Sequence, residues 1–334
     1  MVARRAVLQQ LALLAGSFAL SACGAAATSV VVPEPSLPPL HLSPLSDLVT
    51  GAGLCWAIWG RPNDFTRLAP LNEPIASLLP EPRRALFAHA TAIDINKIRN
   101  IVVASYPDST LFLLDGVPSP IETERLYRER LMSGVTRTVH RADAILLRGV
   151  TASGEKRSLA ALGKDVIALE SGSGLHTKVA ALYAEEKLKR TPRVRDLPDI
   201  AMLLARLGDA PLVAVAPGPF EGDWADAVHG VLGACTAAAA CARPTPTGTI
   251  LTQVLFAGRW GAQTEGALAR ISAAWQDLAR SDFGKLTGLD RSVEAPRTMA
   301  DDRVVGLEVA LDGPRFFQGL HAAVSAEARD IMRL

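Results

Sequence analysis

Aromatic residues and net charge are both scarce in this chain of 334 residues. Aromatic side chains make up 5% of the sequence, and 35 basic residues almost balance 34 acidic ones. A formal charge of +1, without a long block of one sign, lacks the basic surface that nucleic-acid binding requires. A hydrophobic share of 49% excludes disorder of the whole chain. We therefore expect a folded protein with an aliphatic core and no nucleic-acid partner.

Long hydrophobic runs are also absent after the first 20 residues. The longest uncharged candidate, residues 227–242, is rich in alanine and contains His229. It is too short and too weakly apolar to cross a bilayer. Residues 224–239 instead predict an alanine-rich helix buried in the fold.

The first two dozen residues carry the strongest local pattern. Arg4 and Arg5 precede the largely apolar residues 6–20, and Leu20-Ser21-Ala22-Cys23 follows. A short apolar run that ends in small residues is typical of an export signal. The Leu-Ser-Ala-Cys run resembles the lipobox of bacterial lipoproteins. An ordinary secretory signal with a chance cysteine is the alternative, and the twin arginines leave the twin-arginine export route open.

The resemblance implies that Cys23 carries the lipid, as diacylglycerol and a fatty acyl chain such as palmitate. Residues 1–22 would then be removed as a signal peptide, and the chain would have the membrane as its first partner. In Gram-negative lipoproteins an Asp after the lipidated Cys favours the inner membrane. This chain has Gly24 there, so we expect an outer-membrane anchor with the body in the periplasm.

Residues 23–46 predict a tether between the lipid and the folded body. The segment is rich in small residues and contains five prolines, which fix the backbone and favour an extended chain. We expect a first α+β domain or half at residues 47–195 and a second at residues 196–334.

Alternating strand and helix patterns fill both halves and predict an α+β fold. Residues 101–105 and 110–115 form a hairpin pattern, and residues 136–170 read as four short strands. Ser119-Pro120-Ile121-Glu122 forms a capping box that begins a helix. We expect antiparallel sheets covered on one face by helices.

Residues 110–189 and 249–333 share one order of elements, which suggests two weakly similar repeats. Each segment runs as a strand that ends near a glycine, a helix, a hairpin or meander, and a closing helix. Leu114-Asp115-Gly116 corresponds to Phe256-Ala257-Gly258. The alternative is one irregular α+β domain without internal symmetry.

Three cysteines remain if Cys23 carries lipid, and an exported protein favours disulfides. Cys235 and Cys241 are the expected pair, which leaves Cys55 over. Six residues of continuous helix rise about 9 Å, which is too far for a disulfide. The bridge therefore requires the predicted helix to end between the two cysteines.

No motif predicts a catalytic site, a metal site or a cofactor. The glycine-containing residues 149–156 carry Glu155 where a phosphate-binding loop needs lysine. Ser171 and Ser173 lack the glycine that a nucleophile elbow has two residues before its serine. The six histidines are scattered, so they do not suggest a metal site.

Three tryptophans flank predicted strands and offer a binding surface for sugars or a partner, namely Trp56, Trp59 and Trp260. The alternative places them in the core. Our leading hypothesis is a non-catalytic envelope lipoprotein that binds a partner protein or envelope polymer. The second is a periplasmic carrier of a lipid or other apolar ligand, and the third is an envelope hydrolase.

Overall fold

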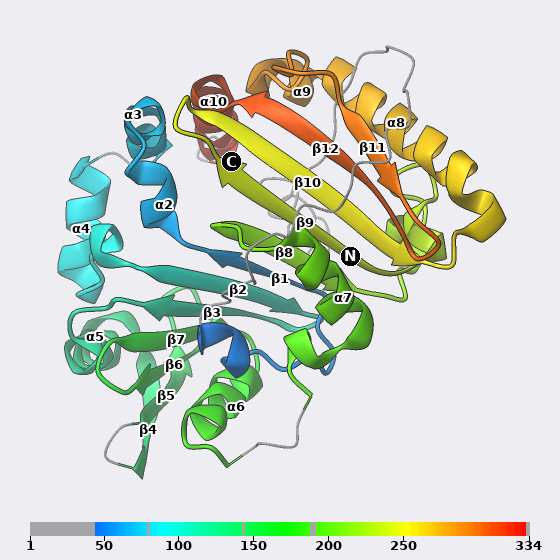
Figure 1. Ribbon diagram of the computed structural model, residues 1–334. Coiled ribbons are helices and arrows are strands. Elements are labelled where there is room, and N and C mark those ends of the chain that lie inside the picture. The colour runs from blue at the N-terminus through cyan, green and yellow to red at the C-terminus, as the bar shows by residue number, and fades with distance from the viewer. Residues whose placement is uncertain (1–43, 79–80, 142–143, 188–191, 332–334) are drawn as a thin grey trace.

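The computed structural model describes residues 44–78, 81–141, 144–187 and 192–331. Within this part of the chain, twelve antiparallel strands form one sheet (Figure 1). The order across the sheet is β11-β12-β10-β9-β8-β1-β2-β3-β7-β6-β5-β4. The strands are β1 (Trp56–Gly60), β2 (Asn100–Tyr106), β3 (Ser109–Asp115), β4 (Ser133–Arg141), β5 (Ala144–Val150), β6 (Lys156–Leu162), β7 (Val166–Ser171), β8 (Leu212–Pro217), β9 (Cys235–Pro244), β10 (Thr249–Gly258), β11 (Arg297–Ala300) and β12 (Val304–Asp312).

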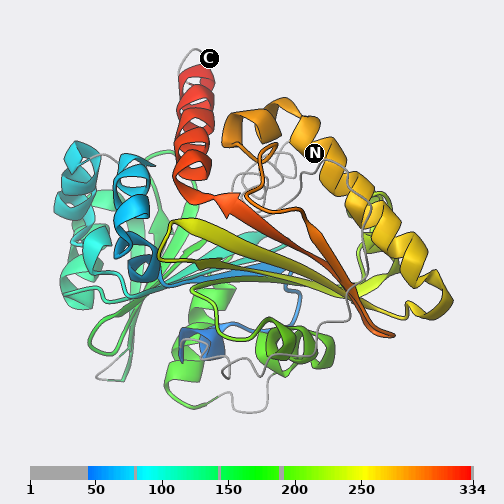
Figure 2. The same ribbon diagram turned by 45° about the horizontal axis from the view of Figure 1, so that its top comes forward.

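Helices cover both faces of this sheet, as Figure 2 shows. One face carries α6, α7 and the short 3-10 helix η1, and the other carries the remaining α-helices. The helices are η1 (Pro44–Leu48), α2 (Pro62–Thr66), α3 (Ala69–Leu78), α4 (Glu81–Thr91), α5 (Pro120–Leu126), α6 (Leu175–Ala184), α7 (Pro198–Leu207), α8 (Thr264–Arg280), α9 (Asp282–Thr287) and α10 (Gly313–Ile331).

The α+β class is confirmed, but the expected helical cover on one face is wrong. All five residues of β1 are buried, so this strand presents apolar side chains to both faces. Ala57 and Trp59 pack toward α7, whereas Trp56 and Ile58 pack on the opposite face. A strand of this kind needs a helical layer on each side.

The predicted alanine-rich helix at residues 224–239 is also wrong. Residues 235–244 form β9, which pairs with β8 and β10 along its length. Ala237, Ala239 and Cys241 share one face of this strand and pack in the same core as α7. Small side chains let α7 approach the sheet closely, and this packing overrides the helix preference of alanine.

The locally encoded elements agree with the sequence patterns. The hairpin β2–β3 and the four strands β4–β7 lie close to the expected ranges. Ser119 begins α5 as predicted, because its hydroxyl oxygen accepts a 3.3 Å hydrogen bond from the Glu122 N–H. Pro120 occupies the first helical turn.

The two expected halves meet through β1 and β8. These strands pair antiparallel, with Ala57 opposite Val215, so the sheet continues from one half into the other. The boundary expected between residues 195 and 196 falls in a 3-10 turn, Val194–Asp196, which precedes α7. The division into two domains stays a prediction.

Candidate functional site

An apolar cavity of about 180 Å³ lies between the sheet and helices α2 and α10. Strands β1, β8, β9, β10 and β12 form its floor, and three side chains of α10 and one of α2 form its roof. The lining residues are Ile58, Phe65, Leu212, Ala242, Ile250, Thr252, Leu311, Phe316, Phe317 and Leu320.

Aromatic packing holds the roof of this cavity together. The rings of Phe65 and Phe317 meet edge to face, with centroids 6.5 Å apart. Phe316 contacts Phe317 in the same manner at 5.6 Å. Such edge-to-face contacts are favourable for aromatic pairs. The roof therefore connects α2, from the first half, to α10, from the second.

Among the described residues of the lining, Thr252 is the one that is polar. Its side chain lies in β10 and is only 3% exposed. The hydroxyl oxygen has no hydrogen-bond partner within the described part of the chain. A buried hydroxyl without a partner costs about 1–3 kcal/mol, so the cavity contains one unsatisfied polar group in an otherwise apolar wall.

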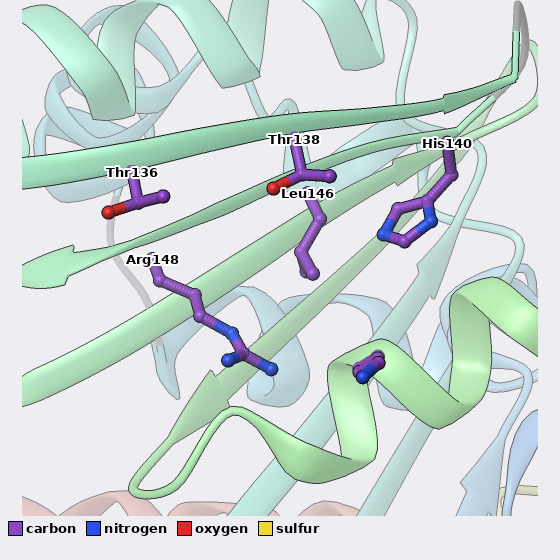
Figure 3. A pocket seen from close by; sticks show the side chains of 6 residues that line it. Thr136, Thr138, His140, Leu146 and Arg148 are labelled. Carbon is purple, nitrogen blue, oxygen red and sulfur yellow. The ribbon is translucent and has the colours of Figure 1, made fainter.

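A second pocket, of about 190 Å³, lies on the opposite face of the sheet beside α6. It is lined by Thr136, Thr138, His140, Leu146, Arg148 and Lys178. Figure 3 shows that the labelled side chains come from two adjacent strands and point toward α6. We call this the basic pocket.

Strand periodicity explains how the basic pocket is assembled. Residues two apart on a strand share a face, which brings Thr136, Thr138 and His140 to one side of β4. The β4–β5 register places Arg148 opposite Thr136 and Leu146 opposite Thr138. The sequence patterns predict both strands β4 and β5, so their alternating polar side chains were the available signal for this site. Nothing in the sequence indicated that α6 would contribute Lys178.

The three tryptophans expected to form a binding surface are buried instead. Trp56, Trp59 and Trp260 are 7%, 5% and 1% exposed. They belong to three different clusters of the core, and Trp56 and Trp59 lie on opposite faces of β1. The expectation of an aromatic surface is wrong because burial of these large rings stabilises the sheet–helix layers.

The expected disulfide between Cys235 and Cys241 is wrong as well. Both cysteines lie in β9, and both are free thiols. Six residues of extended strand span about 20 Å, far beyond the reach of a disulfide. A bulge near Gly258 also turns the thiols to opposite faces, with Cys235 in the core beside α8 and Cys241 in the core beside α7. Cys55 is exposed.

A buried polar network lies at the start of α6, where the sequence has Ser171 and Ser173. The Glu170 carboxylate accepts hydrogen bonds from the Thr177 N–H at 2.6 Å and the Thr177 hydroxyl at 2.7 Å. The Ser173 hydroxyl donates to the same carboxylate at 3.4 Å. A carboxylate bonded to a first-turn N–H caps the helix.

His176 does not complete a catalytic arrangement with this network. Its ring stacks on Tyr106 with centroids 3.4 Å apart, and its Nδ1 atom has no hydrogen-bond partner in the described ranges. Burial lowers the pKa of His176 and raises the pKa of the Tyr106 phenol. The network therefore anchors α6 on the sheet, and within the described residues the Ser173 hydroxyl bonds to the Glu170 carboxylate and not to a histidine.

Cys23, Gly24 and most of the expected tether lie outside the described residues, so the lipid-attachment site stays a prediction. Among the helices that the structure describes, none is long and apolar enough to span a membrane. Within the same residues, no group of three or more His, Cys, Asp or Glu side chains could hold a metal ion.

Comparisons with known proteins do not assign a family. No protein-family model matches the chain, and no curated protein matches it. Among solved structures, the chain is similar to one described as crystal form III of TP0453, at 10% sequence identity. The similarity covers 84% of this chain and 99% of that chain, with a TM-score of 0.46. At this level the likeness assigns neither family nor function.

Proposed function

We propose that this protein is a lipid-anchored component of the bacterial cell envelope that binds a small apolar ligand and does not catalyse a reaction. The observation that carries the binding role is the cavity beside α10, in which nine of the ten lining residues are apolar. Ligand sites are commonly apolar with a few polar groups that orient the ligand. This proposal takes its ligand class from the carrier hypothesis.

The size of the cavity limits the ligand. An engineered apolar cavity of about 150 Å³ binds benzene, and this cavity measures about 180 Å³. It therefore suits a molecule of six to eight heavy atoms, or the end of a longer chain. The Thr252 hydroxyl can donate one hydrogen bond and accept others. A compact alcohol, ketone or ester would satisfy it.

The envelope location rests on the N-terminal pattern. Acylation of Cys23 would hold the protein on a bilayer, and the proline-rich tether that precedes η1 would hold the body off the surface. Gly24 favours the outer membrane, with the body in the periplasm. A body held there would meet apolar molecules that partition between the bilayer and water.

Replacement of Cys23 by serine tests the anchor. We expect Cys23→Ser to abolish incorporation of radiolabelled palmitate and to move the protein out of the detergent phase of a Triton X-114 extraction. Cys55→Ser, which removes an exposed thiol of the body, should leave both unchanged. Palmitate incorporation that survives Cys23→Ser would exclude this residue as the lipid-attachment site.

Methyl NMR spectroscopy of the full chain in phosphatidylcholine nanodiscs tests the ligand site. We expect 1-hexanol to cause saturable shifts of the Ile58 and Ile250 methyl signals, because both residues line the cavity. Ile200 lies in α7 on the opposite face, so its methyl signals should not move.

Two substitutions in β9 separate cavity binding from partitioning into lipid. Ala242→Val adds two methyl groups to the cavity wall and should abolish the shifts. Ala240→Val makes the same change two residues away, outside the lining, and should preserve them. Equal shifts in both variants would contradict the proposed site.

We also propose that the two halves descend from one repeated unit. The first three strands of each half, β1–β2–β3 and β8–β9–β10, are neighbours in the sheet, and a helix follows each set. A later strand then returns to the third, as β7 pairs with β3 and β12 with β10. The closing helices α6 and α10 lie on opposite faces, so the repeat would exclude them.

A further inference from the structure

We infer that the basic pocket between β4, β5 and α6 is a binding site for a phosphate group. This site lies on the opposite face of the sheet from the apolar cavity and does not depend on the function proposed above. Three side chains that carry or can acquire positive charge converge on it from three elements, namely His140, Arg148 and Lys178. Two threonine hydroxyls complete its polar wall.

Among the described residues, no acidic side chain lines this pocket. Within the described part of the chain, no carboxylate lies within ion-pair distance of Arg148, Lys178 or His140. Neighbouring arginines that face elsewhere are paired: Arg137 contacts Glu124 at 3.1 Å and Arg157 contacts Glu155 at 2.8 Å. The described residues therefore leave the positive charge in the pocket unneutralised, which favours an anion.

The nearest acidic group in the sheet register is unavailable to the pocket. Arg148 pairs with Ser158 across β5 and β6, and Ser158 pairs with Glu170 across β6 and β7. Glu170 is 1% exposed, and its carboxylate is bonded to Thr177 beneath α6. An incoming anion would approach from solvent and would not contact this carboxylate.

Arg148 is held in an orientation suited to an anion. One of its terminal nitrogens, Nη2, donates a 2.9 Å hydrogen bond to the carbonyl oxygen of Gly174. Figure 3 shows the guanidinium extending from β5 toward α6. A guanidinium carries five N–H donors, so most remain for a ligand. The planar guanidinium group can donate two parallel hydrogen bonds to two oxygens of one phosphate.

The chemistry of the remaining lining favours phosphate over a simple carboxylate. Lys178 supplies a point charge, and the hydroxyls of Thr136 and Thr138 supply neutral donors. A phosphate has more acceptor oxygens than a carboxylate, so it can use donors on several sides. Because one water occupies about 30 Å³, a volume of about 190 Å³ accommodates a phosphate and a short attached group such as glycerol.

Calorimetric titration of the full chain with sn-glycerol 3-phosphate tests this inference. The chain is placed in phosphatidylcholine nanodiscs, and the titration is repeated in nanodiscs that also contain phosphatidylglycerol. Saturable binding in both supports a soluble phosphate ester as the source of the group. Binding that phosphatidylglycerol blocks supports a lipid headgroup. No binding by glycerol phosphate in phosphatidylcholine nanodiscs would overturn the inference.

Two lysine substitutions provide the matched comparison. Lys178→Gln removes charge from the pocket and should weaken binding about tenfold, because charge-assisted hydrogen bonds are strong. Lys285→Gln removes the same charge from an exposed position in α9 and should leave the affinity unchanged. Equal losses in both variants would show general charge attraction and would contradict a built site.

A substitution that leaves the charge unchanged separates a loss of binding from a folding defect. Thr138 is exposed on β4, so Thr138→Val should preserve the fold, as judged by an unchanged circular dichroism melting curve. It removes one donor and should weaken binding about fivefold, the effect of one hydrogen bond. Undiminished affinity in both Lys178→Gln and Thr138→Val would exclude the basic pocket as the site.

Discussion

Two buried threonines differ in whether their hydroxyl groups have hydrogen-bond partners. The Thr177 hydroxyl, at the start of α6, donates to Glu170 and shares a 2.7 Å hydrogen bond with Ser158. The Thr252 hydroxyl, in the apolar cavity, has no partner in the described residues. A buried polar group stabilises the fold only when its hydrogen bonds are made.

Replacement of each threonine by valine should therefore change stability in opposite directions. Thr252→Val removes an unsatisfied hydroxyl and should raise the free energy of unfolding by about 1 kcal/mol. Thr177→Val removes two hydrogen bonds and leaves a buried carboxylate short of a donor, so it should lower that free energy by about 2–3 kcal/mol. Urea unfolding followed by circular dichroism measures both, and changes of the same sign would contradict this assignment.

The buried cysteines make stability depend on pH in the alkaline range. Burial raises the pKa of Cys235 to about 12 and that of Cys241 to about 11. An ordinary thiol ionises near pH 8.5. Below this pH the thiol is neutral in both the folded and the unfolded state. Above it the unfolded thiol loses its proton while the folded thiol keeps it, so stability falls as pH rises toward 11–12.

Thermal or urea unfolding between pH 9 and 11 tests this effect. Each thiol should contribute up to about 1.4 kcal/mol of lost stability per pH unit. The variants Cys235→Ala and Cys241→Ala should both show a shallower decline than the unaltered chain. Cys55→Ala, at an exposed position, should keep most of the decline. An unchanged slope in both buried-site variants would show that their thiols ionise normally in the folded state.

At the scale of elements, glycine permits the close contact of α9 and α10. Gly319 is buried in α10, and a Cβ atom placed there would lie 2.2 Å from the Leu286 carbonyl oxygen of α9. Such a contact is far too short, and backbone atoms cannot move aside cheaply. The position of α10, and with it the roof of the apolar cavity, depends on this absence of a side chain.

Two glycine-to-alanine substitutions in helices should change the free energy of unfolding in opposite directions. Gly319→Ala should lower the free energy of unfolding by about 1–3 kcal/mol, because it forces α10 away from α9. Gly266→Ala, in α8, meets no atom within 4 Å and should raise stability by up to about 1 kcal/mol through helix propensity. Differential scanning calorimetry measures both, and a stabilising Gly319→Ala would contradict the close packing of these helices.

At the scale of the whole molecule, one large core joins the two expected halves. Leu111 and Leu146 of the first half share this cluster with Leu203 and Leu255 of the second. The sheet also continues through the β1–β8 pair. Apolar contacts and backbone hydrogen bonds that cross a boundary couple the unfolding of both sides.

We therefore expect the halves to unfold together. Leu203 is fully buried in α7, and Leu203→Ala should lower the free energy of unfolding by about 2–5 kcal/mol. Native-state hydrogen exchange should speed up by the same factor at slowly exchanging amides of β6, in the first half, and β10, in the second. Faster exchange in β10 alone would indicate two independently folding domains.

The sequence-based expectations were accurate for elements that depend on nearby residues and less accurate for elements that depend on residues far away in the chain. The hairpins and the Ser119 cap depend on neighbours within a few residues, and they appear in the structure as predicted. Residues 235–244 contain five alanines, a helix-favouring composition, yet they form β9 because β8 and β10 pair with both of its edges. The sites were foreseen less well, since each gathers side chains from distant elements.

By itself, the sequence determined the α+β composition, the short hairpins and the pattern that predicts export and lipidation at Cys23. These features depend on local order along the chain. Only the tertiary structure decided that twelve strands join in one sheet, that Trp56, Trp59 and Trp260 are buried, and that Cys235 and Cys241 stay apart. Those outcomes depend on which distant segments pack together, because burial and pairing are properties of contacts and not of single segments.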